Sequence, residues 1–313
     1  MARSKYGSSY SSSSRCFSDY WDRSPYAISN YARGVVFLAV YLGIFITLFV
    51  ARRRVGAGKR LIGWAYTGAL FFTVIQYIFQ FVLSTLNACD ALNDRTSVYD
   101  TNIASMVFSW LQTMLLLYVV FYLLNIMLRK QLGQNLSVLK VVFGIDLLIL
   151  GVLLLTTTAM LCQYYYWYGH GSYWRSGPTS VYASVYINLA FNAFQVLSII
   201  GSGVLSILAV KSLKQRSMAQ TSLLLWVTVL HFGLLFSAVW TLTLNAMSLG
   251  GPLYNTQTSY EVLSWFSEIF YAVAVASIIV IARNSVWRSA AYAEQQQYAC
   301  QQEAPVYDGA QRA

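Results

Sequence analysis

Seven long apolar segments constrain the fold of this chain more than any other feature. A helix that crosses the hydrocarbon core of a bilayer needs about 20 predominantly apolar residues, and each segment meets that length. Charged residues make up only 10% of the 313 residues, against roughly 25% in soluble domains. The sequence therefore predicts an all-α integral membrane protein, a bundle of seven transmembrane helices. The predicted spans cover approximately residues 32–51, 61–86, 102–128, 138–162, 181–210, 221–247 and 260–282.

The two ends of the chain differ in composition from these segments. Residues 1–31 are rich in Ser and Tyr, residues 284–313 are rich in Gln, and both stretches contain few residues that could form a core. We therefore expect a disordered tail over 1–31, a seven-helix domain over 32–283 and a second disordered tail over 284–313. The first thirty residues lack the apolar stretch of a cleavable signal peptide, so the first span is expected to act as the signal anchor.

The distribution of Lys and Arg predicts the orientation. Segments rich in Lys and Arg remain in the cytosol, and the stretches after the first, third, fifth and seventh spans are richer than the others. The N-terminus is therefore expected outside the cell and the C-terminus in the cytosol, at the plasma membrane. The net charge of +10 is interpreted as this topology signal and not as a sign of nucleic-acid binding. Fourteen residues favour this orientation, namely Arg52, Arg53, Arg54, Lys59, Arg60, Arg129, Lys130, Lys140, Lys211, Lys214, Arg216, Arg283, Arg288 and Arg312; the seven that oppose it are Arg3, Lys5, Arg15, Arg23, Arg33, Arg95 and Arg175.

Two cysteines fall on the predicted outer side, where disulfides persist. Cys89 follows the second span and Cys162 ends the fourth. We expect a disulfide between them, which would tie two outer loops together. Two unpaired thiols, or a bridge from either cysteine to Cys16, are the alternatives that the sequence leaves open.

Polar side chains inside the spans mark the candidate site, because such groups are costly in a bilayer. Spacings of three and four residues place several of them on common helix faces, and most fall in the outer half or near the midplane. Hydrogen bonds that merely join helices, or a proton or ion path through Asp146, His231 and Glu268, are the alternatives. The predicted outward-facing ligand pocket is lined by Gln76, Gln80, Gln112, Asn188, Asn192, Gln195, His231, Trp240, Glu268 and Tyr271.

Two titratable residues in consecutive spans reach similar depth. At a rise of about 1.5 Å per residue, Glu268 lies roughly 12 Å from the outer end of its helix and His231 roughly 15 Å from the inner end. We therefore expect these two side chains to hydrogen-bond across the bundle. The sequence places no Lys or Arg near the bilayer centre, so it offers Glu268 no strong cationic partner.

Seven helices in this orientation resemble the topology of seven-transmembrane receptors, but the motifs of the rhodopsin-like class are absent. Residues 124–130 contain no Asp/Glu-Arg-Tyr triplet, and no proline lies inside a span. A retinal protein needs a Lys in the last helix, which this chain lacks. A membrane zinc hydrolase needs several His ligands, and only His170 and His231 exist. We therefore expect neither a metal nor a cofactor.

Catalysis is not expected either. Ser202, within Gly201-Ser202-Gly203, and His231 fall within about one to two turns in depth, which would suit a Ser–His dyad of an intramembrane hydrolase. However, the segment lacks the Gly-x-Ser-Gly pattern of rhomboid proteases, and small residues are usual where helices pack.

These observations together predict a receptor-like protein with a small or lipidic ligand. We expect the lipid bilayer to surround it and a cytosolic partner to bind at the basic loops, and we expect no nucleic acid as a partner. The alternatives are a proton-coupled or lipid transporter and a non-catalytic structural membrane protein.

Overall fold

The computed structural model describes residues 25–89, 95–134, 136–170, 179–216, 221–249 and 257–287. Seven helices in these ranges are long and apolar enough to cross a membrane. The predicted class, an all-α multi-pass membrane protein, is confirmed. The helices are α2 (Pro25–Arg54), α3 (Trp64–Ala88), α4 (Arg95–Leu117), which continues through the π-helix η2 (Tyr118–Leu124) into α5 (Asn125–Gln131), α6 (Ser137–Gly169), α7 (Thr179–Gln215), α8 (Thr221–Leu249) and α9 (Gln257–Ala282).

The first helix begins earlier than the sequence predicts. Pro25 is its first residue, a position where the missing N–H of proline costs no intrahelical hydrogen bond and its fixed φ suits the helix. Residues 25–31, assigned to the tail by composition, therefore belong to the bundle. The rest of the predicted tails, apart from residues 284–287, lies outside the described residues.

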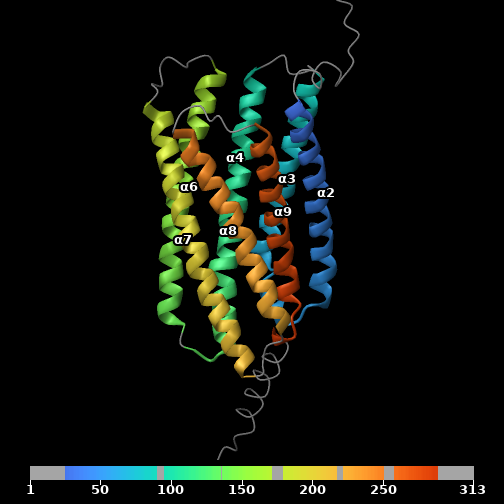
Figure 1. The fold of residues 1–313 in the computed structure, drawn as a ribbon, viewed down its shortest axis with the longest axis vertical. Helices are drawn as coiled ribbons and strands as arrows, with labels where there is room; N and C mark the ends of the chain where they lie inside the picture. Colours follow the sequence, from blue (N-terminus) through green and yellow to red (C-terminus); the bar gives the residue numbers. More distant parts are fainter. Residues whose placement is uncertain are drawn as a thin grey trace, which may run out of the picture.

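The helices run up and down and close into a ring (Figure 1). Each span packs against the next one in the chain, and α9 packs against α2 to complete the ring. The third span leans inward along its length, since η2 contacts α3, α6 and α7, and α5 contacts α7. The third span therefore occupies the centre of one end of the bundle.

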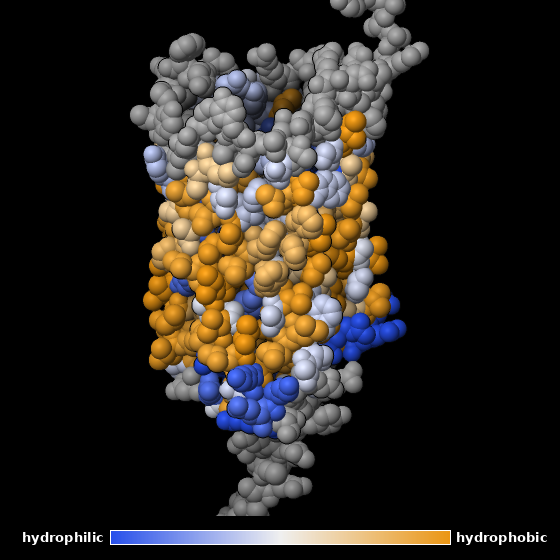
Figure 2. Space-filling view, in the orientation of Figure 1, coloured by the Kyte–Doolittle hydropathy of each residue, from blue (hydrophilic) through white to orange (hydrophobic). Residues whose placement is uncertain are grey.

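The surface divides into an apolar band and a hydrophilic end (Figure 2). Side chains such as Ile46, Val141 and Leu148 are exposed on the band, as expected where lipid replaces water around the helices. We call the hydrophilic end, where α2, α5, α7 and α9 finish, the basic end. Its cationic side chains include Arg52, Arg53 and Arg54 in the last turn of α2, Lys59 and Arg60 in the 3-10 helix η1 (Ala57–Arg60), Arg129 and Lys130 in α5, and Lys214 in α7.

The basic end is closed by tight backbone packing. A Cβ on Gly58 would overlap the carbonyl oxygen of Ala282 and meet the ring of Trp287. Trp287 is 1% exposed, and its Nε1–H donates to the carbonyl oxygen of Ile281 at 2.7 Å. These contacts fix the end of α9 against the loop after α2.

Candidate functional site

A cavity of about 450 Å³ lies in the half of the bundle remote from the basic end. Pockets for small ligands usually measure roughly 300–1,000 Å³, so the cavity is large enough for such a molecule. All seven spans contribute to its wall. The cavity lies in the half that the sequence predicts to face outward.

Eight of the ten residues predicted to line a pocket do line this cavity. The two exceptions are Gln80, which is exposed near the end of α3, and His231, which is 5% exposed and lies closer to the basic end. Helix periodicity placed both on the correct helices but could not give the depth at which the cavity ends. The eight are Gln76, Gln112, Asn188, Asn192, Gln195, Trp240, Glu268 and Tyr271.

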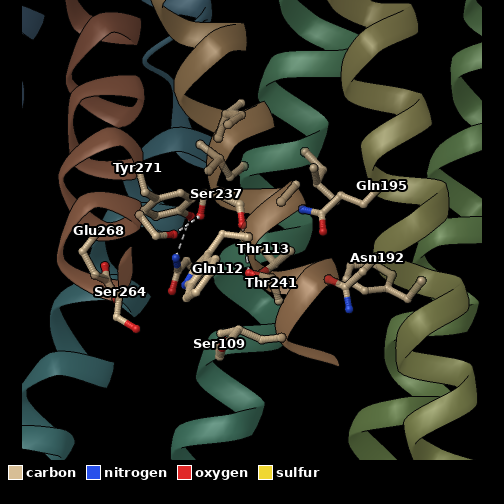
Figure 3. Close-up of a pocket in the computed structure, with 18 of the residues that line it drawn as sticks. Ser109, Gln112, Thr113, Asn192, Gln195, Ser237, Thr241, Ser264, Glu268 and Tyr271 are labelled. Atoms are coloured by element: carbon tan, nitrogen blue, oxygen red, sulfur yellow. Dashed lines mark hydrogen bonds between the residues drawn. The ribbon is translucent and has the colours of Figure 1, made fainter. Parts of the chain in front are cut away.

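One side of the cavity carries a carboxyl group surrounded by phenols. The hydroxyl of Tyr77 donates to Oε2 of Glu268 at 2.6 Å. One turn further along α9, the Tyr271 hydroxyl accepts from Nε2 of Gln112 at 2.8 Å. These bonds join α3 and α4 to α9 and hold four polar side chains in fixed positions at the cavity wall, of which Gln112, Glu268 and Tyr271 are labelled in Figure 3.

Arg33 also lines the cavity, and the sequence reading missed it. The charge count grouped Arg33 with the N-terminal tail, although it falls inside the predicted first span, and it lies two turns into α2. Tyr77 and Glu268 line the same cavity, and Arg33 donates a hydrogen bond to Oδ1 of Asn30 at 2.7 Å. The sequence offers Glu268 no strong cationic partner, and its hydrogen-bond partner in the described residues is Tyr77. The signal that could have found Arg33 is a charged residue at the start of the first predicted span.

A second carboxyl group closes the gap between α2 and α9 nearer the helix starts. The hydroxyl of Ser29 donates to Oε2 of Glu261 at 2.9 Å and accepts from Nε1 of Trp265 at 3.1 Å. Glu261 is 8% exposed and is not part of the cavity wall. It therefore serves as an inter-helix contact beside the cavity.

The opposite side of the cavity is formed by uncharged amides. Nδ2 of Asn192 donates to the backbone oxygen of Asn188 at 2.7 Å, which fixes that amide along α7. In Figure 3 the side chains of Asn192 and Gln195 lie across the cavity from Ser264 and Glu268. The cavity thus has one charged side, at α2 and α9, and one neutral polar side, at α7.

A second polar cluster lies below the cavity floor, and we call Asn125, Ser202, Ser206 and His231 the inner cluster. Nδ2 of Asn125 donates to Oγ of Ser202 at 2.9 Å, and Oδ1 of Asn125 accepts from Ser206 at 3.0 Å. The same amide also reaches the Phe121 carbonyl in η2, at 3.1 Å. π-Helical turns disturb the regular backbone pattern, so Asn125 provides a partner there.

His231 completes the inner cluster. Its Nδ1 lies 2.9 Å from the carbonyl oxygen of Val227, which can only accept, so Nδ1 carries the proton and Nε2 faces the Ser202 hydroxyl at 3.5 Å. The predicted hydrogen bond between His231 and Glu268 is therefore wrong, since each has other partners. Equal depth along two helices does not fix the direction in which their side chains point.

Asp146 and the two outer cysteines lie away from the cavity wall. Asp146 lies at the α6–α7 interface, where it accepts from Ser198 at 2.7 Å.

Cys89 and Cys162 both carry thiols, so the predicted bridge is not formed. α4 packs against α3 and α6 and so lies between the helices that carry the two cysteines. Within the described ranges no cluster of three His, Cys, Asp or Glu could hold a metal.

Comparison with known proteins gives no relative. No family model matches the sequence, and no curated protein and no solved structure is similar to it at a significant level. What the protein does must therefore be argued from the cavity and the residues around it.

Proposed function

We propose that this membrane protein is receptor-like and binds a small or lipidic ligand in the cavity. The observation that carries the proposal is a cavity of about 450 Å³, lined by polar side chains from several helices, at the end of the bundle opposite the basic end. If these polar groups only joined helices, that half should be tightly packed. The cavity therefore favours binding over a purely structural role.

The orientation of this proposal follows from the basic end. Short segments rich in Lys and Arg remain in the cytosol, and the described cationic side chains gather where α2, α5, α7 and α9 finish (Figure 2). The cavity would then lie toward the cell exterior, with the N-terminus, and the C-terminus would be cytosolic. The plasma membrane is the location that gives such a cavity access to an extracellular ligand.

A route from the cavity to the basic end is also available. Ile199 and Leu234 line the cavity floor, and Ser202 and His231 follow them one turn closer to the basic end on α7 and α8. A ligand that moves these helices would change the distance between Ser202 and His231. At the far end of α7, Arg216 donates to the Leu132 carbonyl at 3.2 Å, so a shift there would alter the surface offered to a cytosolic partner.

The carrier alternative finds less support. It needs a connected series of titratable groups, yet Asp146, His231 and Glu268 have Ser198, Ser202 and Tyr77 as their respective side-chain partners. We propose that the protein is not an enzyme. Ser202 and His231 are adjacent, but Ser202 is 1% exposed and lies beneath the cavity floor, so water and substrate have no described path to it.

The test compares two threonines of α8. Thr241 lines the cavity, whereas Thr228 is exposed on the outside of the same helix, and each hydroxyl bonds to the carbonyl four residues earlier. The full-length protein in nanodiscs is screened by thermal unfolding against amino acids, aromatic amines, fatty acids and lysophospholipids. A ligand at 100 times its Kd stabilises by about 2.7 kcal/mol.

Thr241→Phe fills the cavity and should abolish the stabilisation, while Thr228→Phe should retain it. Stabilisation that survives in Thr241→Phe would place binding elsewhere. The absence of any stabilising compound for the unmodified protein would remove the support for a receptor.

A further inference from the structure

We propose that the ligand of this cavity is a small zwitterion, with an ammonium group bound by Glu268 and Gln112 and an anionic group bound by Arg33. This inference rests on the proposed function and deepens it. It starts from a hydrogen-bonding group in the cavity wall that has no partner among the residues that the structure describes.

That group is the side-chain oxygen of Gln112. Gln112 is 8% exposed and lines the cavity, and its Oε1 is buried without a hydrogen-bond donor. Its nitrogen is already used on Tyr271. In Figure 3 Gln112 extends between the α9 side chains and the α7 amides, with its oxygen turned away from Tyr271. A buried acceptor left unpaired costs about 1–3 kcal/mol, so a ligand that donates an N–H here would recover that cost.

A carboxyl group and a guanidinium group line the same cavity as this acceptor. Glu268 accepts from Tyr77, and Arg33 donates to Oδ1 of Asn30 at 2.7 Å. Within the part of the chain that the structure describes, the guanidinium and the carboxyl thus have separate partners while both line the cavity. A ligand with a single charge would neutralise one of them and leave the other. A zwitterion matches both.

The order of the charges along the bundle fixes the orientation of the ligand. α2 and α9 both start at the end remote from the basic end, and the Ser29–Glu261 hydrogen bond sets their register. Arg33 follows Ser29 by four residues and Glu268 follows Glu261 by seven, so Glu268 lies deeper by about 4.5 Å. The ammonium group would therefore lie at the deeper position and the anionic group nearer the helix starts.

The remaining wall indicates what the rest of the ligand is like. Apolar and aromatic side chains line it beside the neutral amides of α7. An aromatic or branched apolar body would bury its surface there, and the amides add no net charge. These side chains are Leu154, Phe191, Trp240, Leu244 and Tyr260.

Three probes with the same aromatic body separate the two charges. Phenylalanine carries both, phenethylamine carries only the amine, and 3-phenylpropanoate carries only the carboxylate. Their dissociation constants are measured by titration calorimetry on the full-length protein in nanodiscs. Phenylalanine should bind most tightly, since a hydrogen bond to a charged group at each end gives it at least about tenfold over either single-charge probe.

The variants assign each charge. Glu268→Gln should weaken phenylalanine and phenethylamine at least about tenfold and leave 3-phenylpropanoate unchanged. Arg33→Gln should weaken phenylalanine and 3-phenylpropanoate and leave phenethylamine unchanged. Glu261→Gln is the matched control, because Glu261 is a carboxyl on the same helix outside the cavity wall, and it should change none of the three.

Other outcomes overturn the inference. Equal binding of the three probes, or a ranking that Glu268→Gln and Arg33→Gln leave intact, would mean that the charges do not recognise the ligand. If none of the probes binds while a fatty acid stabilises the protein but not Thr241→Phe, the zwitterion inference is wrong and the receptor-like proposal stands. If no compound class binds, both fail.

Discussion

Replacing Gly203 by Ala should destabilise the bundle through the inner cluster. A Cβ at this position would lie 3.0 Å from Cδ2 and 3.2 Å from Cγ of the His231 ring. The ring cannot move away freely, because Nδ1 is bonded to Val227 and Nε2 faces Ser202. The added methyl group must therefore either compress this contact or displace His231 from its partners.

The magnitude follows from two opposing terms. Adding a methylene to a packed interior costs about 1–3 kcal/mol, and each hydrogen bond lost between membrane helices adds roughly 0.6 kcal/mol. Replacing Gly by Ala in a helix returns up to about 1 kcal/mol. The net loss for Gly203→Ala is about 1–2 kcal/mol. Gly201 lies on the same helix with nothing within 4 Å of its Cβ position, so Gly201→Ala should be neutral or stabilising by up to about 1 kcal/mol.

The assay is unfolding of the purified protein by sodium dodecyl sulfate in mixed micelles, followed by circular dichroism. His231→Ala removes the ring, so Gly203→Ala should cost nothing further in that background. Equal stability of Gly203→Ala and Gly201→Ala would refute the tight contact. An undiminished loss in the His231→Ala background would show that the cost arises elsewhere.

Three further outcomes are expected. A Cβ on Gly233 would lie 2.5 Å from the Phe270 carbonyl oxygen, whereas Gly43 has open space; in the same unfolding assay Gly233→Ala should lose about 1–3 kcal/mol and Gly43→Ala should not. Asn125→Leu leaves the π-helical carbonyls and Ser206 without their partner and should lower the stability by about 1–3 kcal/mol in the same assay. A variant as stable as the unmodified protein would contradict this expectation. With Cys16 and Cys300 replaced by Ser, mass spectrometry should find both Cys89 and Cys162 alkylated without prior reduction. If alkylation requires reduction first, the two cysteines form the disulfide that the sequence predicts.

The membrane class and the seven spans could be predicted from the sequence, because apolar length alone decides whether a helix can cross a bilayer. The ends of the helices could not. Hydropathy falls where Ser29, Asn30 and Arg33 occur, although these residues continue α2. Arg33 lies inside the predicted span, but it was grouped with the charges of the tail and so was left out of the candidate site.

Polar side chains at helical spacing share a face, and Asn188, Asn192 and Gln195 therefore lie together along the cavity wall. The inner cluster could not be assembled in the same way. Asn125 and Ser206 pair through the π-helix of the third span, and an apolar stretch such as residues 118–124 carries no sign of a change in helical pitch. The proximity of Ser202 and His231 was predicted, but which groups they bond to depends on side-chain direction.

We expect the cavity to be accessible from the side of the membrane where α2 begins, which is the cell exterior in the proposed orientation. Thr241→Cys and Thr228→Cys, in a background without native cysteines, test it with a charged, membrane-impermeant thiol reagent applied to intact cells. Thr241 lines the cavity and Thr228 is exposed on the apolar outside of the same helix. We expect the reagent to label Thr241→Cys in intact cells and to leave Thr228→Cys unlabelled. Labelling of Thr241→Cys only after the membrane is permeabilised, or not at all, would contradict it.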